Sequence, residues 1–379
     1  MRIAVDARAY FQRTGIARYT RELLRAIVET NRADEFLILI SDHHRPEEIP
    51  FRSTRIDVRV SQAGWLAGTS ERAQISREVR AWKADVFHSI FPPIAVTGIS
   101  SIVTVFDLTP LSHPHLHQPA VVDAFRASIR PALTNASAVV TLSNAVAEET
   151  ARRFPRVADS ICIAGAGLSE PFSNSEPSRT ARSGVLFVGT IEPRKNVPVV
   201  VDTARALRAR GYRGPIDIVG KPGWGGFDVD RAIEGLKDVR YRGFVDDGAL
   251  LGLYRRRQFF LYPSAAEGFG LPVLEAMSQG AIPLVSSDPA LREVVGDRRF
   301  VVDVSNPQAI AQTVQKWSGY PAGHIYKVAA ALARRARRHT WERAARRILR
   351  LYSGKAKSSA SGASADYQTS EGVICHVGE

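Results

Sequence analysis

Cysteine is scarce in this sequence: among 379 residues only Cys162 and Cys375 occur, in unrelated contexts. Two such cysteines exclude a disulfide framework and a cysteine-based zinc site, and they favour a reducing compartment. Long apolar runs are also missing, since no stretch approaches the ~20 apolar residues of a membrane span. The first apolar run is interrupted by Asp6 and is too short for a signal peptide. We therefore expect a cytoplasmic protein that meets a membrane, if at all, peripherally at its inner face.

Negative charge is in deficit. The chain has 38 Asp and Glu against 51 Lys and Arg, which gives a net charge of +13. Such an excess favours a polyanionic partner, whether nucleic acid, anionic lipid or a phosphorylated substrate. The densest basic cluster comprises Arg334, Arg335, Arg337, Arg338, Arg343, Arg346, Arg347 and Arg350. No nucleic-acid motif accompanies it, so nucleic acid is not expected; an anionic membrane surface and an ordinary solvated helix face both stay open.

Several catalytic signatures are absent as well. There is no Gly-x-Gly-x-x-Gly fingerprint, no Walker A loop, no Gly-x-Ser-x-Gly elbow and no cysteine nucleophile. His113, His115 and His117 alternate, but no cysteine or carboxylate lies at metal spacing from them, so we expect no metal site. Asp246 and Asp247 precede a predicted helix, where N-capping explains them better than metal binding.

What the sequence does contain is a regular alternation of short apolar runs and helical stretches. This alternation predicts α/β domains with parallel sheets, and a Ser-, Pro- and Arg-rich linker separates two such halves. The expected organisation is a first Rossmann-like domain over 1–167, a linker over 168–184, a second Rossmann-like domain over 185–325, a basic helix over 326–352 and a disordered tail over 353–379.

Residues 188–196, "VGTIEPRKN", follow a predicted strand and precede a predicted helix. Arg194 and Lys195 lie just before the helix N-terminus, whose free amides and dipole favour anions. Two cations beside those amides suit a diphosphate, and they would stabilise its growing charge if it leaves during a reaction. An ordinary solvated basic pair is the alternative.

Residues 263–280, "PSAAEGFGLPVLEAMSQG", hold two glutamates. Pro272 suits the first turn of a helix, so Glu267 is expected in a loop and Glu275 in the first helical turn. The glycines of this loop allow a ligand to approach the backbone, and the amides that follow can point at it. Those loop residues are Gly268, Phe269, Gly270 and Leu271. A further glycine, Gly15, follows the first strand and could admit a phosphate or simply form a turn.

These stretches together resemble the retaining glycosyltransferases of family 4. "EGFGLPVLE" is similar to their glutamate–seven–glutamate signature and "GTIEPRKN" to their phosphate-binding loop. "VDARAYFQRTGIARYTREL", "IVGKPGWGG", "RGFVDDGALLGLY" and "TWERAARRILRLY" also match, so the resemblance extends to about residue 352. Within this family the chain resembles the bacterial mannosyltransferases of O-antigen and exopolysaccharide assembly.

The resemblance implies the GT-B fold, with a deep interdomain cleft and a C-terminal helix that crosses back to the first domain. It implies a nucleotide-sugar donor, such as GDP-mannose, a saccharide or lipid-linked acceptor, and no metal or other cofactor. Arg194 and Lys195 would bind the diphosphate. Glu267, with the amides of Phe269, Gly270 and Leu271 in the glycine loop that begins at Gly268, would hold the donor sugar. Glu275 would hold the ribose, the backbone at Val245 the base, and Gly15 would approach the diphosphate.

Two departures from the family pattern stand out. Many relatives have a histidine before Asp107, where this chain has Phe106, and some have an arginine where it has Thr190. Asp107 and His113 are therefore assigned only to the acceptor side. Two rival functions stay open: a glycoside hydrolase using the two glutamates as acid and base, and a non-catalytic basic protein bound to a membrane surface.

Overall fold

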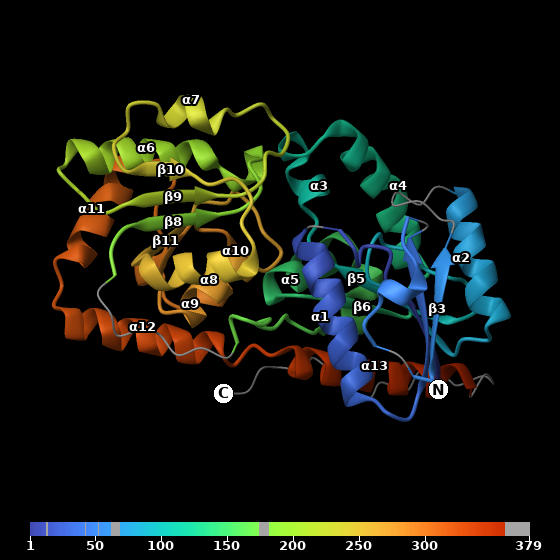
Figure 1. Cartoon of the computed structure of the whole chain (residues 1–379). Helices are drawn as coiled ribbons and strands as arrows, with labels where there is room; N and C mark the ends of the chain where they lie inside the picture. Colours follow the sequence, from blue (N-terminus) through green and yellow to red (C-terminus); the bar gives the residue numbers. More distant parts are fainter. Residues whose placement is uncertain (13, 42, 52, 62–68, 174–181, 361–379) are drawn as a thin grey trace. The chain divides into compact units, whose positions relative to one another are not determined.

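The computed structural model describes residues 1–12, 14–41, 43–51, 53–61, 69–173 and 182–360. The chain forms two compact units (Figure 1). The first contains Met1–Leu111, Ala120–Gly167 and the chain from Thr340 onward, and the second contains Ser112–Pro119 and Leu168–His339.

The first unit is built on a parallel sheet of seven strands in the order β3-β2-β1-β4-β5-β6-β7. The strands are β1 Arg2–Asp6, β2 Glu35–Ser41, β3 Ile56–Ser61, β4 Val86–Ser89, β5 Ser100–Val105, β6 Ala138–Thr141 and β7 Ile161–Ile163. Central strands such as β4, β5 and β6 are buried along their whole length, as continuous apolar runs covered on both faces should be. Strand β3 lies at the edge and is partly exposed.

The helices of the first unit are α1 Gly15–Thr30, α2 Thr69–Ala81, α3 Thr109–Ser112, α4 Pro119–Thr134, α5 Asn144–Arg153 and α13 Trp341–Ala360. The last of them, α13, packs against α1 although more than 300 residues of chain separate the two (Figure 1). A buried hydrogen-bonded group anchors α13: the ring nitrogens of His88 lie 2.6 Å from Tyr352 Oη and 2.8 Å from Thr104 Oγ1. The predicted return of the C-terminal helix to the first domain is therefore confirmed.

The second unit holds a parallel sheet of five strands in the order β10-β9-β8-β11-β12. The strands are β8 Val185–Val188, β9 Ile216–Val219, β10 Val239–Tyr241, β11 Phe259–Tyr262 and β12 Ile282–Val285. After β8 the chain winds outward to β9 and β10, and after β11 it winds the other way to β12. The order of strands therefore reverses between β8 and β11, and open α/β sheets bind ligands at the carboxyl ends of the strands at such a point.

The helices of the second unit are α6 Val197–Ala209, α7 Val229–Ile233, α8 Asp247–Arg256, α9 Leu271–Ser278, α10 Pro289–Val295, α11 Pro307–Ser318 and α12 Ala322–Ala336. Helix α6 packs against α11, while α9 packs against α10 and α12.

The C-terminal segment differs from the prediction in two respects. The single basic helix expected over 326–352 is two helices, α12 and α13, that belong to different units. The break follows from side-chain burial: Ala333 and Ala336 are buried in the second unit, whereas Trp341 and Ala345 are buried in the first. The tail expected to be disordered from 353 onward is helical to Ala360. Residues 361–379, like 174–181 of the predicted linker, lie outside the described residues.

Candidate active site

The predicted phosphate loop and glutamate loop follow adjacent strands. A 3₁₀ turn, η4 Pro193–Lys195, comes after β8, and the loop that contains Glu267 comes after β11. These two strands flank the point at which the strand order reverses. The two loops also bond directly, since the amide of Ala265 donates to the carbonyl of Arg194 at 2.8 Å. The fold thus brings together side chains that lie 72 residues apart in the sequence.

Glu267 is the centre of this cluster. Its Oε1 accepts a hydrogen bond from Lys195 Nζ at 2.5 Å, and its Oε2 lies 3.0 Å from Arg194 NH1. The hydroxyl of Ser264 also donates to Oε1. Both carboxylate oxygens therefore have charged or polar donors, an arrangement that strongly favours the ionised form.

The pKa of Glu267 follows from these contacts. Burial alone would raise it, but the charges of Arg194 and Lys195 and the bonds from Lys195 and Ser264 lower the pKa of the carboxyl from its usual 4.5 to about 2. A general acid in glycoside hydrolysis needs the opposite shift, toward a raised pKa. Glu267 is therefore a permanent carboxylate at neutral pH, suited to accepting hydrogen bonds and unsuited to donating a proton.

Lys195 is buried, with 9% of its surface exposed. Besides Glu267, its ammonium donates to Tyr262 Oη at 2.6 Å. Burial lowers the pKa of Lys195 and the charge of Arg194 lowers it further, while Glu267 opposes both. Burial also raises the pKa of the Tyr262 phenol well above 10, so the phenol stays neutral and acts as a polar acceptor. The interpretation of residues 194 and 195 as a solvated basic pair is wrong, because both side chains are largely buried and both pair with Glu267.

Arg194 joins three parts of the cluster. Its guanidinium lies 2.8 Å from Glu192 Oε1, 3.0 Å from Glu267 Oε2, and donates to the carbonyl of Ala266 at 3.0 Å. Its side chain is 17% exposed. Because a guanidinium carries five N–H donors in a planar fork, one arginine can hold both the glutamate loop and the η4 turn.

The glycine loop leads into α9 as predicted, with Gly270 as its N-cap in the left-handed region at φ 102°. A Cβ at Gly270 would lie 2.6 Å from Leu291 Cδ2, so a larger residue would also force the Leu291 side chain to move, while the positive φ is what favours glycine there. The Phe269 ring is buried and packs edge-on to His339 at a centroid distance of 5.6 Å. The amides of Phe269, Gly270 and Leu271 lie at the N-terminus of α9, where helical amides have no intrahelical partner.

Glu275 does not lie in the first turn of the helix, as the sequence predicted. Helix α9 begins at Leu271, so Pro272 is its second residue and Glu275 its fifth. The side chain is 4% exposed, and Oε2 accepts a hydrogen bond from Tyr254 Oη of α8 at 3.1 Å. Its assignment to the donor's ribose stays a prediction.

Val245 lies between β10 and α8, next to a cap that the sequence predicted correctly. Asp246 is the N-cap of α8 and accepts from the amide of Ala249 at 2.7 Å, so its interpretation as a cap is confirmed. The neighbouring Phe244 is the most exposed large apolar side chain among the described residues, at 62%.

The remaining predicted residues come from other loops. Gly15 is the first residue of α1, and a Cβ there would meet nothing within 4 Å, so packing does not require glycine. Asp107 Oδ1 accepts from the amide and hydroxyl of Thr109 at the start of α3. Phe106, where the family resemblance led us to expect a histidine, packs edge-on against Tyr19 and Phe91. His113 Nδ1 lies 3.1 Å from Ser112 Oγ.

Sequence reasoning missed three residues of the cluster: Tyr262, Ser264 and Asp288. Asp288 follows β12 and accepts from the amide of Glu267 at 3.2 Å. Tyr262 and Ser264 flank the end of β11 in "FFLYPS". Their only signal in the sequence is their position at the carboxyl end of a strand beside the switch point.

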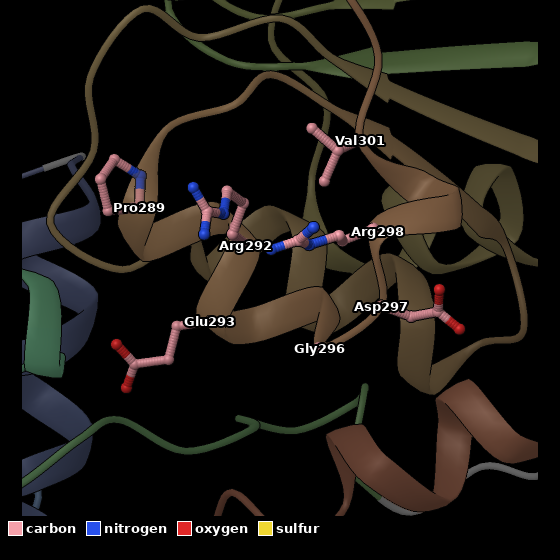
Figure 2. A pocket seen from close by; sticks show the side chains of 7 residues that line it. All are labelled: Pro289, Arg292, Glu293, Gly296, Asp297, Arg298 and Val301. Carbon is pink, nitrogen blue, oxygen red and sulfur yellow. The ribbon is translucent and has the colours of Figure 1, made fainter.

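A hollow of about 340 Å³ lies on the second unit beside α10. Figure 2 shows its lining, which is Pro289, Arg292, Glu293, Gly296, Asp297, Arg298 and Val301. None of the predicted site residues lines it.

Within the part of the chain that the structure describes, no group of three or more His, Cys, Asp or Glu side chains is placed to hold a metal ion. The expectation of a metal-free enzyme stays a prediction.

Two family models match the chain in succession. Residues 13–167 match "Glycosyltransferase Family 4" and residues 169–339 match "Glycosyl transferases group 1". Among curated proteins, O-antigen chain mannosyltransferase B of Escherichia coli is 27% identical over 89% of this chain and 96% of its own length. The E. coli serotype-specific mannosyltransferase WbdA is 24% identical over a stretch that covers 66% of this chain and 34% of WbdA.

Solved structures share the fold. Sucrose-phosphate synthase from Thermosynechococcus elongatus superposes with a TM-score of 0.70 at 19% identity, covering 95% of this chain and all of that one. Anabaena HepE, in complex with UDP and glucose, superposes with a TM-score of 0.69 at 17% identity over 93% of this chain and all of its own. The two parallel α/β units and these matches show that the chain belongs to the family 4 glycosyltransferases of the GT-B fold and is a hexosyltransferase.

Proposed function

We propose that the enzyme transfers mannose from GDP-mannose to a saccharide or lipid-linked acceptor in the synthesis of a cell-surface polysaccharide. The observation that carries the proposal is the buried group of Arg194, Lys195 and Glu267 at the switch point between β8 and β11. It joins cations suited to a diphosphate to a carboxylate suited to sugar hydroxyls. The choice of mannose draws on the O-antigen mannosyltransferases of E. coli.

The choice of GDP as the carrier rests on a third relative. A GDP-mannose-dependent α-(1-6)-phosphatidylinositol dimannoside mannosyltransferase of Mycobacterium tuberculosis is 30% identical over 48% of this chain and 47% of its own length. A second structure of Anabaena HepE is instead a complex with UDP-glucose. GDP-mannose is therefore the first donor to test and UDP-glucose the second.

In the proposed reaction, the bond between the sugar C1 and the phosphate oxygen breaks while a bond from C1 to the acceptor oxygen forms on the same face, with retention. The departing phosphate oxygen takes the proton of the acceptor hydroxyl. Lys195 and Arg194 stabilise the charge that grows on the diphosphate, so no metal is required. Glu267 holds sugar hydroxyls, since a carboxyl whose pKa is about 2 accepts a proton poorly at neutral pH.

The remaining assignments are those that the family resemblance implies. Amides at the N-terminus of α9 face the donor, Glu275 binds the ribose, and the backbone at Val245 binds the base. Gly15 approaches the diphosphate, and Asp107 and His113 serve the acceptor. A hydrolase that uses Glu267 as its acid is disfavoured, because the cations beside it depress the pKa of that carboxyl.

A panel of nucleotide-sugars tests the proposal by thermal shift, because a ligand that binds only the folded state stabilises it. We expect GDP-mannose at about 100 times its Kd to add about 2.7 kcal/mol to the stability, and UDP-glucose to add less. The anomeric configuration of the product, read by NMR, tests retention. If no GDP- or UDP-sugar shifts the transition, the donor-binding role of the cluster is refuted.

We also propose that the enzyme is a peripheral protein of the inner face of the cytoplasmic membrane. Helix α13 exposes Arg343, Arg346 and Arg350, although Arg346 pairs with Glu342 at 2.5 Å. Anionic lipid attracts such a basic face. Among the described residues, no helix is long and apolar enough to cross a bilayer. Co-sedimentation with anionic but not with neutral vesicles is expected; equal sedimentation with both would refute the basic surface as a membrane contact.

A further inference from the structure

Asp288 connects Glu267 to a neighbouring helix. It follows β12 and is the N-cap of α10, where its Oδ1 accepts from the amide of Leu291 at 3.0 Å. Its Oδ2 accepts from the amide of Glu267 at 3.2 Å. One carboxylate thus fixes both the start of a helix and the backbone of the central residue of the cluster.

Two serines extend this connection. The amide of Asp288 donates to Ser286 Oγ at 3.3 Å, and that hydroxyl donates to the carbonyl of Ser264 at 2.6 Å. The hydroxyl of Ser264 in turn donates to the Glu267 carboxylate. Asp288 therefore fixes the backbone of Glu267, and Ser264 fixes its side chain. The hydrogen bonds of Ser286 connect Asp288 to Ser264 across the ends of β11 and β12.

Helix capping alone does not account for an aspartate at this position. Asp228 and Asp246 cap α7 and α8 with a single oxygen each, toward Arg231 and Ala249. Asparagine caps helices as well as aspartate does, and it would avoid a second carboxylate close to Glu267. Only a carboxylate offers two acceptor oxygens, one for the cap and one for the amide of Glu267.

We propose that Asp288 is a positioning residue for donor-sugar recognition: it holds the backbone of Glu267 so that the carboxylate meets the sugar hydroxyls in a fixed place. The inference rests on the proposed function, in which Glu267 binds the sugar and the cations of η4 bind the diphosphate. It follows that losing the Asp288 contact weakens recognition of the sugar and leaves recognition of the diphosphate intact. Burial, with a contribution from the charge of Glu267, raises the pKa of Asp288 to about 6, which fits a carboxylate enclosed beside another one.

The substitution Asp288→Asn separates the two contacts. The asparagine oxygen keeps the cap of α10, but its amide nitrogen then faces the amide of Glu267, donor against donor. The two donors repel each other, so the backbone of Glu267 shifts and its carboxylate loses a hydrogen bond to the sugar, which corresponds to about a tenfold change in Kd. We expect the Kd of GDP-mannose to rise about tenfold by calorimetry and the Kd of GDP to change less than twofold. Asp228→Asn, the same change at an exposed cap, is expected to alter neither Kd.

The possible outcomes test the positioning role of Asp288 separately from the proposed donor-binding function. If wild-type protein binds neither GDP-mannose nor UDP-glucose, the proposed donor role falls and the inference with it. If wild type binds GDP-mannose and Asp288→Asn binds it equally well, or loses GDP and GDP-mannose to the same extent, the positioning role alone is refuted. Should Asp288→Asn fold poorly, Ser286→Ala decides: it breaks the link to Ser264, and we expect the same selective loss for GDP-mannose, about two- to fivefold. Unchanged binding by a folded Ser286→Ala would overturn the proposal.

Discussion

Removing the ammonium of Lys195 tests the cluster most directly. In Lys195→Ala, Glu267 loses its 2.5 Å partner and Tyr262 loses a 2.6 Å partner. A hydrogen bond to a charged group contributes about 1.5–3 kcal/mol, and removing one member of a fully buried ion pair costs about 3–5 kcal/mol. Because Arg194 still neutralises Glu267 and Ser264 still donates a hydrogen bond to it, the lower range applies. In a unit of this size, a loss of about 1.5–3 kcal/mol lowers Tm by about 3–12 °C.

The effect on turnover is expected to be larger than the effect on stability. Losing a donor that stabilises charge in the transition state lowers kcat by about 10²–10³-fold. Purified Lys195→Ala is assayed for mannose transfer from GDP-mannose below its Tm, with Lys316→Ala as control, because Lys316 is exposed on α11 of the same unit. We expect the control to retain wild-type turnover and Tm. Turnover within twofold of wild type in folded Lys195→Ala would refute the diphosphate role of Lys195.

Three further predictions follow from individual contacts. Gly15→Ala should leave Tm unchanged or raise it, because a Cβ there has open space, yet reduce donor turnover; Gly323→Ala, also with open space, should leave turnover unchanged. Tyr262→Phe should lower the free energy of unfolding by about 1.5–3 kcal/mol in urea titration, more than Tyr241→Phe, because only Tyr262 accepts from a cation. The depressed pKa of Glu267 stabilises the fold above pH 4.5, and this contribution is lost as pH falls toward about 2. The stability difference between wild type and Glu267→Gln should therefore shrink between pH 5 and pH 2, and a constant difference would contradict the ion-pair assignment.

The fold was predictable where strands are buried on both faces. The apolar runs FLILI (36–40) and SAVVTLS (137–143) predict strands that the structure shows as β2 and β6, as expected for parallel strands covered on both faces. Strand β3 went unrecognised because it is an edge strand, and its sequence IDVRVS carries charges between its apolar residues. The division between α12 and α13 was also missed, because periodicity reports that a segment is amphipathic and not which core its apolar face meets.

The site was predictable in its charged residues and not in its supporting ones. Arg194 and Lys195 are two adjacent cations just before a helix start, and Glu267 is a charged residue in a glycine loop; charged residues in such positions indicate a ligand site. Tyr262 and Asp288 look like an ordinary strand residue and an ordinary helix cap, and only strand order reveals that they meet Glu267 or its partner. The burial of Lys195 could not be predicted either, because a basic pair in a loop is usually exposed to solvent and only the fold shows that this one is enclosed.

The formal charges of the cluster lead to a last prediction. Arg194 and Lys195 are balanced by Glu192 and Glu267, so these four side chains together carry no net charge before a diphosphate arrives with its negative charge. Lys195 uses two of its three N–H donors on Glu267 and Tyr262, which leaves one for a phosphate oxygen without displacing Glu267.

Glu267 should therefore stay in the cluster when the donor binds, and its charge should oppose the diphosphate. At about 6 Å and an effective dielectric of about 20, that repulsion amounts to about 3 kcal/mol before screening. Glu267→Gln removes the charge and keeps the size of the side chain. We expect it to bind GDP at least about fivefold more tightly than wild type at pH 7, while transfer from GDP-mannose falls because the sugar loses its carboxylate. Calorimetry with GDP measures the first effect and initial rates the second. Weaker binding of GDP by this variant would show that Arg194 and Lys195 serve to hold Glu267 and do not bind the diphosphate.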